Sequence, residues 1–489
     1  MTAPLVVVGD ALLDVDVLGV ARRLCPDAPV PVLDDIEEHA RPGGAALAAL
    51  MAARDGHDVV LVTAIGDDEA GSRLRQRLTG LRVVCVPYDG PTPVKSRIRS
   101  GGQSLVRLDR GTAVGRFGDV GAAATTALGA AGTVLVSDYG RGVTGLPGLR
   151  DGIAALPNSV PVVWDPHPRG ADPVPGTHLV TPNSAEAASW AQRHGVALPS
   201  GPSAASGLGV VLAHASALVR AWQARAVAVT LGSRGAVLTY GDGAPAVSPA
   251  PAVHCVDPCG AGDRFAVTAA IELGRGRLPT EAVDAAVRAA SAYVSAGGPV
   301  AFSDHESSQP TQLTGPLTGP LTASTPGNAA AVVRRVHAAG GVVVAAGGCF
   351  DLLHAGHIAT LQGARRLGDC LVVCVNSDAS VRRLKGPSRP LVSQQDRTHV
   401  LSALECVDAV AVFDEDTPAD VLERLRPDIW VKGGDYAGVD VPEASVLSRW
   451  AGQVVTLSYL AGRSTSQLAA TAAGSSTDQP FHRTEERTT

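Results

Sequence analysis

The chain contains very little lysine and no CxxC cysteine pair. Only three of its 41 basic residues are lysine, at Lys95, Lys385 and Lys432. We inspect each of these lysine positions, because the planar guanidinium of arginine does not substitute for the compact charge of a lysine ammonium group. The eight cysteines include no CxxC motif, which excludes a zinc ribbon and gives no support to a disulfide framework. We therefore expect a reducing, intracellular compartment.

Long apolar segments and a strong net charge are also missing. Residues 120–137 carry no charge but consist mostly of Ala, Gly and Thr, so they are predicted to form a helix and a strand rather than a membrane span. The first residues lack a basic n-region, so we expect no signal peptide. The net charge of −6 argues against a nucleic-acid-binding surface or a polybasic membrane patch. We expect a cytoplasmic protein that binds neither nucleic acid nor a membrane.

The composition predicts two folded domains joined by a linker. Hydrophobic residues make up 45% of the 489 residues and charged residues 18%, which permits packed cores and excludes global disorder. Residues 303–328 are rich in Pro, Thr, Ser and Gly and repeat TGPL in tandem, as is typical of a flexible linker. The polar residues 471–489 are predicted to be a disordered tail. The predicted domains are therefore 1–302 and 329–470.

Both predicted domains alternate short β-branched runs with Ala-rich helical segments. Continuous apolar strands separated by helices indicate parallel sheets covered on both faces, so the predicted fold class is α/β. Ligands of such sheets bind at the carboxyl ends of the strands. The expected strands are 5–8, 59–63, 134–137, 162–164, 179–181 and 226–231 in the first domain, and 342–346, 371–375, 409–413, 429–431 and 454–457 in the second.

The strongest motif of the first domain is DPCGAGD at residues 257–263, which opens an Ala-rich helix. The chain has no GxxxxGK[ST] motif, so it is not a P-loop protein. Gly260, Ala261 and Gly262 leave backbone N–H groups bare at a helix N-terminus, where they stabilise a phosphoryl group that gains charge. Asp263 follows directly and could take a proton from an attacking alcohol. The alternative is an ordinary capping Asp.

Further polar residues follow the predicted strands of the first domain. Acidic Asp10 and Asp14 follow the first strand and could bind sugar hydroxyls, and the RPGGAA segment at 41–46 opens a helix with bare glycines. Asn183 and Glu186 follow another strand and could organise Mg²⁺ and its waters. The TLGSRG segment at 230–235 could pass beside a nucleotide.

Together these motifs resemble the ribokinase-like (PfkB) sugar kinases over residues 5–300. The segments CPDAPVPV at 25–32, PVK at 93–95 and SDYGRG at 137–142 resemble the heptose-7-phosphate kinase branch. The resemblance implies an αβα domain with a small β lid, ATP and Mg²⁺, and a homodimer through the lid as a candidate assembly. It implies Asp263 as the base, Gly260, Ala261 and Gly262 as the anion hole, Asp14, Gly43, Gly44 and Lys95 as sugar contacts, and Thr230, Gly232 and Gly235 on the ATP side.

Three positions depart from the pattern of that family. Leu47 stands where members usually carry Asn, His167 where they often carry Lys, and Arg264 where a small hydroxyl residue follows the base. Loss of an amide that bonds a sugar hydroxyl could change substrate preference or turnover. Two alternatives therefore stay open: the kinase half is a scaffold or acts on another sugar, or the whole chain is a non-catalytic nucleotide sensor.

The second domain carries an HxGH motif after its first predicted strand, in AGGCFDLLHAGH at 346–357. His354 and His357 at a helix start can donate hydrogen bonds to an α-phosphate that gains charge. A zinc site would need further ligands, which the spacing does not supply, and two core histidines are the remaining alternative. Lys385, Lys432 and the GRSTS segment with Arg463, Ser464 and Thr465 could bind a triphosphate.

This domain resembles the cytidylyltransferase-like nucleotidyltransferases, in the heptose-1-phosphate adenylyltransferase branch, with an extended match at 369–397. The resemblance implies a Rossmann-like fold, ATP as the nucleotide, and Phe350 and Asp351 in its binding site. The order of the two domains resembles that of the bifunctional enzymes that make ADP-heptose. Such enzymes phosphorylate D-glycero-β-D-manno-heptose 7-phosphate at C1 and, after a separate phosphatase acts, transfer AMP to the 1-phosphate. The residues alone identify no metal site.

Overall fold

A computed structural model describes residues 3–101, 103–111, 114–196, 207–255, 257–299, 329–433 and 441–457. These residues form two compact units, the first mostly within residues 1–322 and the second mostly within 323–489. The predicted linker 303–328 and tail 471–489 lie outside the described residues, so the predicted domain bounds stay a prediction. No helix among the described residues is long and apolar enough to cross a membrane.

The first unit is built on a nine-stranded sheet with the order β5-β4-β1-β10-β11-β12-β13-β14-β15. Strands from β5 to β13 pair in parallel, whereas β14 and β15 add an antiparallel edge. The chain changes direction between β1 and β10, and such a switch point leaves a crevice at the carboxyl ends of the two strands. The strands are β1 (Leu5–Gly9), β4 (Val59–Thr63), β5 (Arg82–Cys85), β10 (Thr133–Ser137), β11 (Val162–Asp165), β12 (Leu179–Val180), β13 (Val227–Thr230), β14 (Ala236–Thr239) and β15 (Ala246–Ser248).

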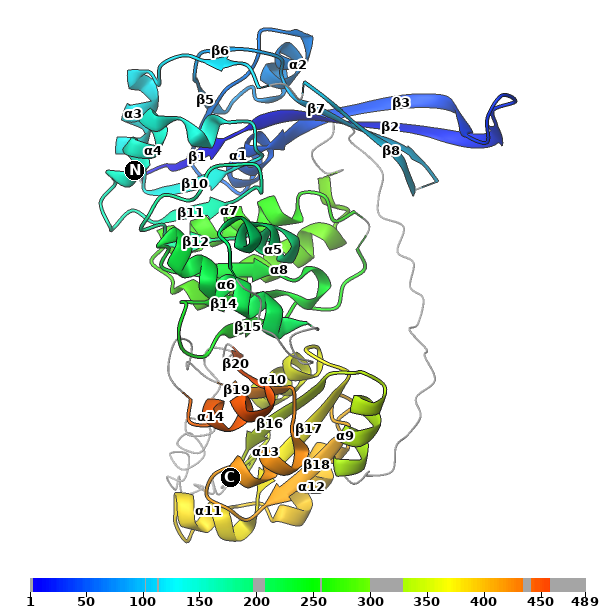
Figure 1. Cartoon of the computed structure of the whole chain (residues 1–489), viewed down its shortest axis with the longest axis vertical. Helices are drawn as coiled ribbons and strands as arrows, with labels where there is room; N and C mark the ends of the chain where they lie inside the picture. Colours follow the sequence, from blue (N-terminus) through cyan, green and yellow to red (C-terminus); the bar gives the residue numbers. More distant parts are fainter. Residues whose placement is uncertain are drawn as a thin grey trace, which may run out of the picture. The chain divides into compact units, whose positions relative to one another are not determined.

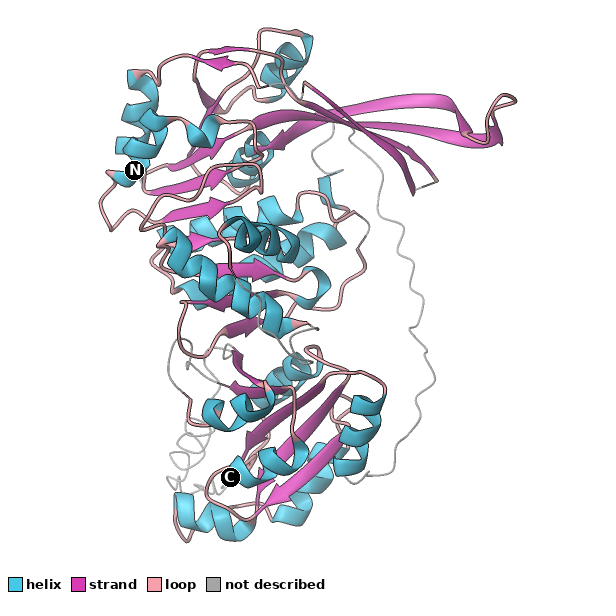
Figure 2. Ribbon diagram, viewed as in Figure 1, coloured by secondary structure: helices cyan, strands magenta, loops and turns pink. Residues whose placement is uncertain are grey.

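Helices cover both faces of this sheet, and Figure 2 shows them on either side of the strands. Alternate strand residues such as Val7, Leu61 and Leu135 pack with α1, α7 and α8 into one hydrophobic core, because successive side chains of a strand point to opposite faces. Helices α3 to α6 pack on the other face. The helices are α1 (Ala45–Arg54), α2 (Glu69–Arg77), α3 (Ala122–Gly129), α4 (Pro147–Ala154), α5 (Ser184–Arg193), α6 (Leu208–Trp222), α7 (Ala261–Gly274) and α8 (Pro279–Ser295).

A second sheet, of four strands, projects from the α/β layers of the first unit (Figure 1). Its order is β3-β2-β7-β8, and its two longest strands have 14 residues each. The base of β2 is buried and its outer half is exposed, so the sheet joins the core only at its base. The strands of this lid are β2 (Ala11–Leu24), β3 (Pro31–Gly44), β7 (Val94–Ser100) and β8 (Gln103–Arg110), and the short strands β6 (Tyr88–Asp89) and β9 (Arg116–Phe117) pair nearby.

The second unit contains a smaller sheet with the order β18-β17-β16-β19. The pairs β16–β17, β17–β18 and β16–β19 are parallel, and the order is that of a Rossmann-like sheet with its switch point between β16 and β19. Helices α10 and α12 pack on one face and α9 and α13 on the other. The elements are α9 (Ala329–Ala338), β16 (Val343–Gly348), α10 (Ala355–Arg365), β17 (Cys370–Asn376), α11 (Asp378–Lys385), α12 (Gln394–Ser402), β18 (Ala409–Phe413), α13 (Ala419–Leu425), β19 (Ile429–Gly433) and α14 (Ala444–Leu447). Most of β20 (Gln453–Leu457), the last described strand, belongs to the first unit.

The strands predicted from continuous apolar runs are confirmed, with ends that agree to within two residues. The lid strands were not predicted as strands, because their outer halves are exposed and rich in charge rather than apolar. The antiparallel strands β14 and β15 were not predicted either. They are four and three residues long.

The turn between β13 and β14 generates a prediction about stability. Gly235 has φ +100°, and a Cβ added there would lie 2.0 Å from the carbonyl oxygen of Ser248. Gly56 also has positive φ, +84°, but nothing lies within 4 Å of an added Cβ. We expect Gly56→Ala to cost about 1 kcal/mol of stability and Gly235→Ala about 4 kcal/mol or more, since backbone must move. Hydrogen exchange of β13–β15 peptides in urea measures the free energy of unfolding of both variants. Equal losses of stability would contradict the close packing of Gly235 against Ser248.

Candidate active sites

Asp263 lies in the first turn of α7, at the carboxyl end of the sheet of the first unit. Gly260 is the residue before the helix and has φ +80°, a conformation that glycine adopts without strain. The carboxylate of Asp263 is buried, with 5% of the residue exposed. Burial raises its pKa to about 7, against the hydrogen bond from Tyr139, which lowers it. A carboxylate with such a pKa can accept a proton near neutral pH.

The predicted anion hole surrounds the start of the same helix. The N–H of Ala261 donates to the carbonyl of Pro258 at 3.1 Å, so this group already has a partner. Gly260 is packed closely, because an added Cβ would lie 2.7 Å from the hydroxyl of Tyr293 and 3.1 Å from Leu47 Cδ2. Glycine is therefore required here by conformation and by space.

The predicted sugar contacts converge on the base of the lid. Asp14 on β2 is buried and accepts from Arg97 Nη1 at 3.3 Å. A Cβ at Gly43 would lie 2.7 Å from Asp14 Oδ2, so the glycine makes room for this carboxylate. Lys95 pairs with Asp14 in register. Burial lowers the pKa of Lys95 overall, although the negative charges of Asp14 and Asp263 act to raise it. The structure thus brings Asp14, Gly43 and Lys95 together near the candidate base.

Asp10, proposed from the sequence as a sugar ligand, has a different role. Its Oδ2 accepts the N–H groups of Tyr139 (3.0 Å) and Arg141 (2.9 Å), and its Oδ1 accepts that of Val143 (3.0 Å). The side chain is 2% exposed. Asp10 therefore fixes the loop that follows β10, in which SDYGRG lies. Sequence inspection missed this role, because a backbone partner leaves no mark in the sequence.

The three positions that depart from the family pattern have identifiable environments. Leu47 in α1 is buried against Gly260. Arg264 points to the start of the loop after α1, where it forms an ion pair of 2.5 Å with Asp55. Burial and the nearby Arg169, Lys95 and Arg141 lower the pKa of His167 to about 4, so this imidazole is neutral at pH 7. Arg264 therefore links α7 to α1, and His167 does not supply the charge of a lysine.

The predicted nucleotide residues of the first unit lie at the ends of neighbouring strands. Asn183 and Thr230 form a parallel bridge. Asn183 Oδ1 accepts the N–H groups of Ala185 and Glu186 at 2.9 Å, and Glu186 Oε2 accepts the N–H of Asn183 at 2.9 Å, which is a capping box at the start of α5. Burial raises the pKa of Glu186. Both side chains thus have a structural role in addition to any contact with Mg²⁺.

The second unit contains a cavity of about 540 Å³ at the switch point between β16 and β19. This volume suits a nucleotide-sized ligand. Four residues predicted from the sequence, Phe350, Asp351, His357 and Lys385, lie in its wall. The cavity is lined by Ala346, Gly347, Gly348, Cys349, Phe350, Asp351, His357, Thr360, Leu361, Lys385, Arg389, Val431 and Gly433.

The two histidines of HxGH lie against each other at the start of α10. Their ring centres are 4.0 Å apart, and the rings are stacked. His354 precedes the helix, and its Nδ1 accepts the N–H of Gly356 at 3.1 Å, which leaves Nε2 to carry the proton in the neutral ring. Burial and the neighbouring His354 lower the pKa of His357 to about 4. The ring of His357 is therefore neutral at pH 7, with one nitrogen that donates and one that accepts.

Asp351 and Arg389 organise the wall of this cavity. Asp351 Oδ2 accepts from Arg389 Nη1 at 2.6 Å, and its Oδ1 accepts the N–H groups of Leu391 (2.6 Å) and Val392 (3.1 Å). Burial raises the pKa of Asp351, but these bonds outweigh it and the pKa is lowered overall. Asp351, predicted as a nucleotide contact, thus also holds the 389–392 loop.

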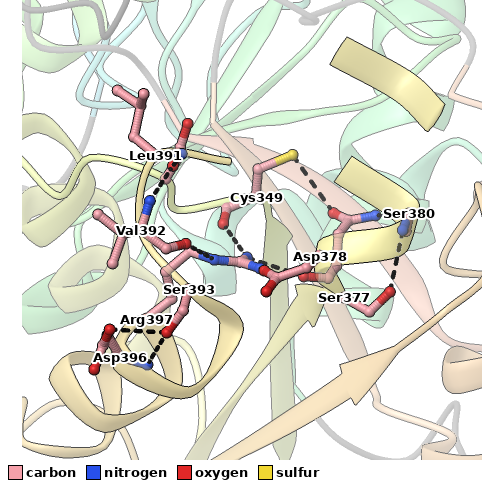
Figure 3. Close-up of polar contacts among 11 residues, drawn as sticks. Cys349, Ser377, Asp378, Ser380, Leu391, Val392, Ser393, Asp396 and Arg397 are labelled. Atoms are coloured by element: carbon pink, nitrogen blue, oxygen red, sulfur yellow. Dashed lines mark hydrogen bonds and ion pairs between the residues drawn. The ribbon is translucent and has the colours of Figure 1, made fainter. Parts of the chain in front are cut away.

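Arg397 in α12 is a buried residue that the sequence analysis did not single out as functional. Its guanidinium donates to the carbonyls of Cys349 (2.6 Å), Asn376 (2.9 Å) and Val392 (3.1 Å) and pairs with Asp378 at 2.8 Å. Figure 3 shows Arg397 in the middle of this network, between Cys349, Val392 and Asp378. One side chain therefore ties together the carboxyl ends of β16 and β17 and the loop that holds Asp351.

The remaining predicted residues of the second unit are not part of this arrangement. Lys432 Nζ donates to Glu443 Oε2 at 3.0 Å; its neighbours Val431 and Gly433 line the cavity. Arg463, Ser464 and Thr465 lie outside the described residues. Within the part of the chain that the structure describes, no group of three His, Cys, Asp or Glu could hold a metal ion.

Comparisons with known proteins identify the family of each domain. Residues 3–306 match the pfkB family of carbohydrate kinases, and residues 345–478 match the cytidylyltransferase-like family. The bifunctional protein HldE of Streptomyces coelicolor is 56% identical over 471 residues, covering 96% of each chain. HldE of Azorhizobium caulinodans is 37% identical over 486 residues, covering 96% of this chain and 98% of that protein. A solved ribokinase structure of Arabidopsis thaliana aligns with a TM-score of 0.47 and 22% identity, covering 60% of this chain and 93% of that one.

The fold and the two sites define an enzyme with two activities, a sugar kinase joined to a nucleotidyltransferase. The ribokinase-like and Rossmann-like folds expected from the sequence are confirmed. The chain belongs to the family of bifunctional heptose kinases and adenylyltransferases represented by HldE.

The burial of Asp263 generates a prediction about the kinase reaction. Because the base acts when ionised and its pKa is raised to about 7, we expect the kinase rate to fall as the pH drops below about 7. Asp263→Asn keeps the size of the side chain but cannot accept the proton, so turnover should fall on the order of 10²–10⁴-fold. Its residual rate should no longer show this acid limb. A pH series of ADP release measures both, and a variant that keeps most of its rate would contradict the assignment.

The network around Arg397 generates a prediction about the second site. The single ammonium of Arg397→Lys cannot reach all four acceptors of the guanidinium, which leaves buried oxygens without donors. The second unit should therefore lose about 2–4 kcal/mol of stability, and adenylyl transfer should fall with it. Arg383 is a matched control, since its ion pair with Asp416 is 2.8 Å long but half-exposed. Arg383→Lys should cost less than about 1 kcal/mol. Thermal unfolding and pyrophosphate release compare them, and equal effects would refute the role of Arg397.

Proposed function

We propose that the first unit uses ATP to phosphorylate D-glycero-β-D-manno-heptose 7-phosphate at C1. The second unit then joins heptose 1-phosphate to AMP from ATP and releases pyrophosphate. The observation that carries this proposal is the placement of Asp263 and of the His354–His357 pair at helix starts, each at the switch point of its own sheet. Family membership at 56% identity supports the substrate class.

In the kinase step, the sugar lies between the base of the lid and the start of α7. Asp14 accepts hydrogen bonds from sugar hydroxyls, and Asp263 takes the proton of the C1 hydroxyl as its oxygen attacks the γ-phosphorus of ATP. The N–H groups of Gly260 and Gly262 face the charge that grows on the transferred phosphoryl group. ADP leaves, and the proton remains on Asp263 until the product departs.

In the second step, no protein nucleophile is needed. A phosphate oxygen of heptose 1-phosphate attacks the α-phosphorus of ATP, and the bond to pyrophosphate breaks. Nε2–H of His354 and the neutral ring of His357 donate hydrogen bonds to the α-phosphate oxygens as charge builds on them. Lys385 and Arg389 in the cavity wall neutralise the departing pyrophosphate.

Magnesium is proposed to enter with ATP. The described residues offer no cluster that could hold a metal by itself, and Mg²⁺ is commonly bound by substrate phosphates together with one or two carboxylates. Glu186 would hold it at the kinase site, through waters. The ion would neutralise charge on the phosphates, which the carboxylates of this site would otherwise repel.

The lid is proposed as a contact between two copies of the chain in the cytoplasm, where ATP and sugar phosphates are found. Half of the exposed large apolar side chains among the described residues lie on the lid and its hairpin, and exposed apolar groups gathered on one element favour association. They are Leu18, Val20, Leu24, Val30, Ile36, Val106 and Leu108.

The alternative, in which the kinase half is a scaffold or acts on another sugar, is not favoured. Leu47 and Arg264, the residues that raised it, both have partners away from the carboxylate of Asp263, in Gly260 and Asp55. Relatives match both halves together over nearly their whole length. A non-catalytic nucleotide sensor would not need a buried carboxylate at the start of α7.

The two activities should be separable by mutation. Incubation with heptose 7-phosphate, ATP, Mg²⁺ and a phosphatase that removes the 7-phosphate should give ADP-heptose by mass spectrometry. His354→Ala with His357→Ala should stop at heptose 1-phosphate with kinase turnover near wild type. Asp263→Asn should form product from heptose 7-phosphate about 10²–10⁴-fold more slowly but should still convert added heptose 1-phosphate at the wild-type rate. A wild-type chain that converts only heptose 1-phosphate would support the alternative for the kinase half.

A further inference from the structure

Tyr139 contacts the candidate base directly, although none of the roles assigned above uses it. Its hydroxyl lies 2.8 Å from Oδ1 and 2.9 Å from Oδ2 of Asp263. An ionised carboxylate only accepts hydrogen bonds, so the phenol is the donor. Burial and the negative charge of Asp263 raise the pKa of Tyr139 well above its ordinary value, which keeps the phenol protonated. One O–H shared between two oxygens fixes the orientation of the carboxylate group.

The ring of Tyr139 is held from several sides. Its backbone N–H donates to Asp10 Oδ2 at 3.0 Å, which fixes the start of the loop after β10. Lys95 Nζ, from the lid strand β7, lies 4.6 Å from the ring centre, a favourable position for a cation over an aromatic face. A Cβ added at Gly44 would lie 3.3 Å from Tyr139 Cδ2. The hydroxyl is therefore aimed at Asp263 by the loop, the lid and the start of α1.

We propose that Tyr139 is a positioning residue for phosphoryl transfer, whose hydroxyl holds the Asp263 carboxylate ionised and oriented. When the sugar binds, this hydroxyl keeps its hydrogen bond to one carboxylate oxygen and releases the other, which then accepts a hydrogen bond from the acceptor hydroxyl of the sugar. This inference rests on the proposed function in taking Asp263 as the base. The proton of the acceptor hydroxyl goes to the oxygen that Tyr139 has released. Tyr139 keeps its own proton and its bond to the other oxygen, while the sugar oxygen bonds to the γ-phosphorus and the bond to ADP breaks.

The charges around Asp263 show why one hydrogen bond matters here. Burial raises the pKa of the carboxyl most, and Asp14 and Glu186 raise it further. The hydrogen bond from Tyr139 lowers it more than Lys95 does. Without Tyr139 the base would be protonated over more of the neutral pH range. The titratable groups that face Asp263 are Asp14 from β2, Lys95 from β7, Tyr139 after β10, Asp165 from β11, Glu186 from α5 and Tyr293 from α8.

The test compares Tyr139→Phe with Tyr88→Phe in the full chain. Tyr88 is a matched control, since its hydroxyl accepts the N–H of Gly115 at 2.9 Å in the same unit, away from Asp263. For Tyr139→Phe we expect the acid limb of the kinase pH–rate profile to move up by about one unit. The rate should fall about tenfold near pH 6 and recover to within a few-fold of wild type at high pH. Tyr88→Phe should leave the profile unchanged.

A second measurement needs no substrate. In protein that carries ¹³C-labelled aspartate, the carboxyl resonance of Asp263 is the one that disappears in Asp263→Asn. This resonance should titrate about one pH unit higher in Tyr139→Phe than in the wild type. Should that variant fold poorly, 3-fluorotyrosine at position 139 keeps the shape of the ring. Its more acidic hydroxyl is a stronger donor, so the titration of Asp263 should move downward.

Each other outcome overturns the inference. A change in KM for the sugar with an unmoved acid limb would make Tyr139 a sugar contact instead. A uniform loss of rate at all pH values, with an unchanged titration of Asp263, would mean that Tyr139 serves packing alone. The titration decides the question even if the wild-type chain does not phosphorylate heptose 7-phosphate. If Asp263→Asn keeps the kinase rate, the proposed function fails at its base, whatever the titration shows.

Discussion

The hydrogen bonds that Asp10 accepts from three backbone N–H groups hold the kinase site together. β1 ends at the switch point of the sheet, and the loop after β10 must turn there without a strand partner. Buried N–H groups without acceptors cost free energy, and one carboxylate satisfies three of them. The same loop carries Tyr139, which reaches Asp263 on α7. The position of the base therefore depends on an acidic residue that does not touch it.

In the second unit, a buried positive charge satisfies the backbone groups at the strand ends, whereas in the first unit a carboxylate does so. There the strand ends present carbonyl oxygens, which need donors, and Arg397 supplies them to Cys349 and Asn376 at the ends of β16 and β17. A guanidinium has five N–H donors in a rigid plane and can bridge several acceptors at once. In both units, a buried charge shapes the crevice at the switch point, and the residues for the chemistry come from neighbouring helix starts.

At the three positions that depart from the family pattern, the effect of the residue depends on where its side chain points and what surrounds it. Arg264 next to the base could have intruded on the reaction, yet its guanidinium reaches Asp55 at the end of α1. Leu47 packs on Gly260 and helps to exclude water from the start of α7. His167 is neutral because it is buried and because three cations lie near it. Each effect depends on direction and surroundings, which are properties of the folded chain.

The sequence by itself determined the α/β class and the buried parallel strands, and it singled out Asp263, His354 and His357 as the candidate chemical groups. Apolar runs and bare glycines at helix starts are local patterns, so they can be read along the chain. Only the tertiary structure decided that Asp10 and Arg397 organise the sites, that Asn183 and Glu186 cap a helix, and that Tyr139 meets Asp263. These contacts join residues distant in sequence, such as Tyr139 and Asp263, and only the packing of strands and helices brings them within hydrogen-bonding distance.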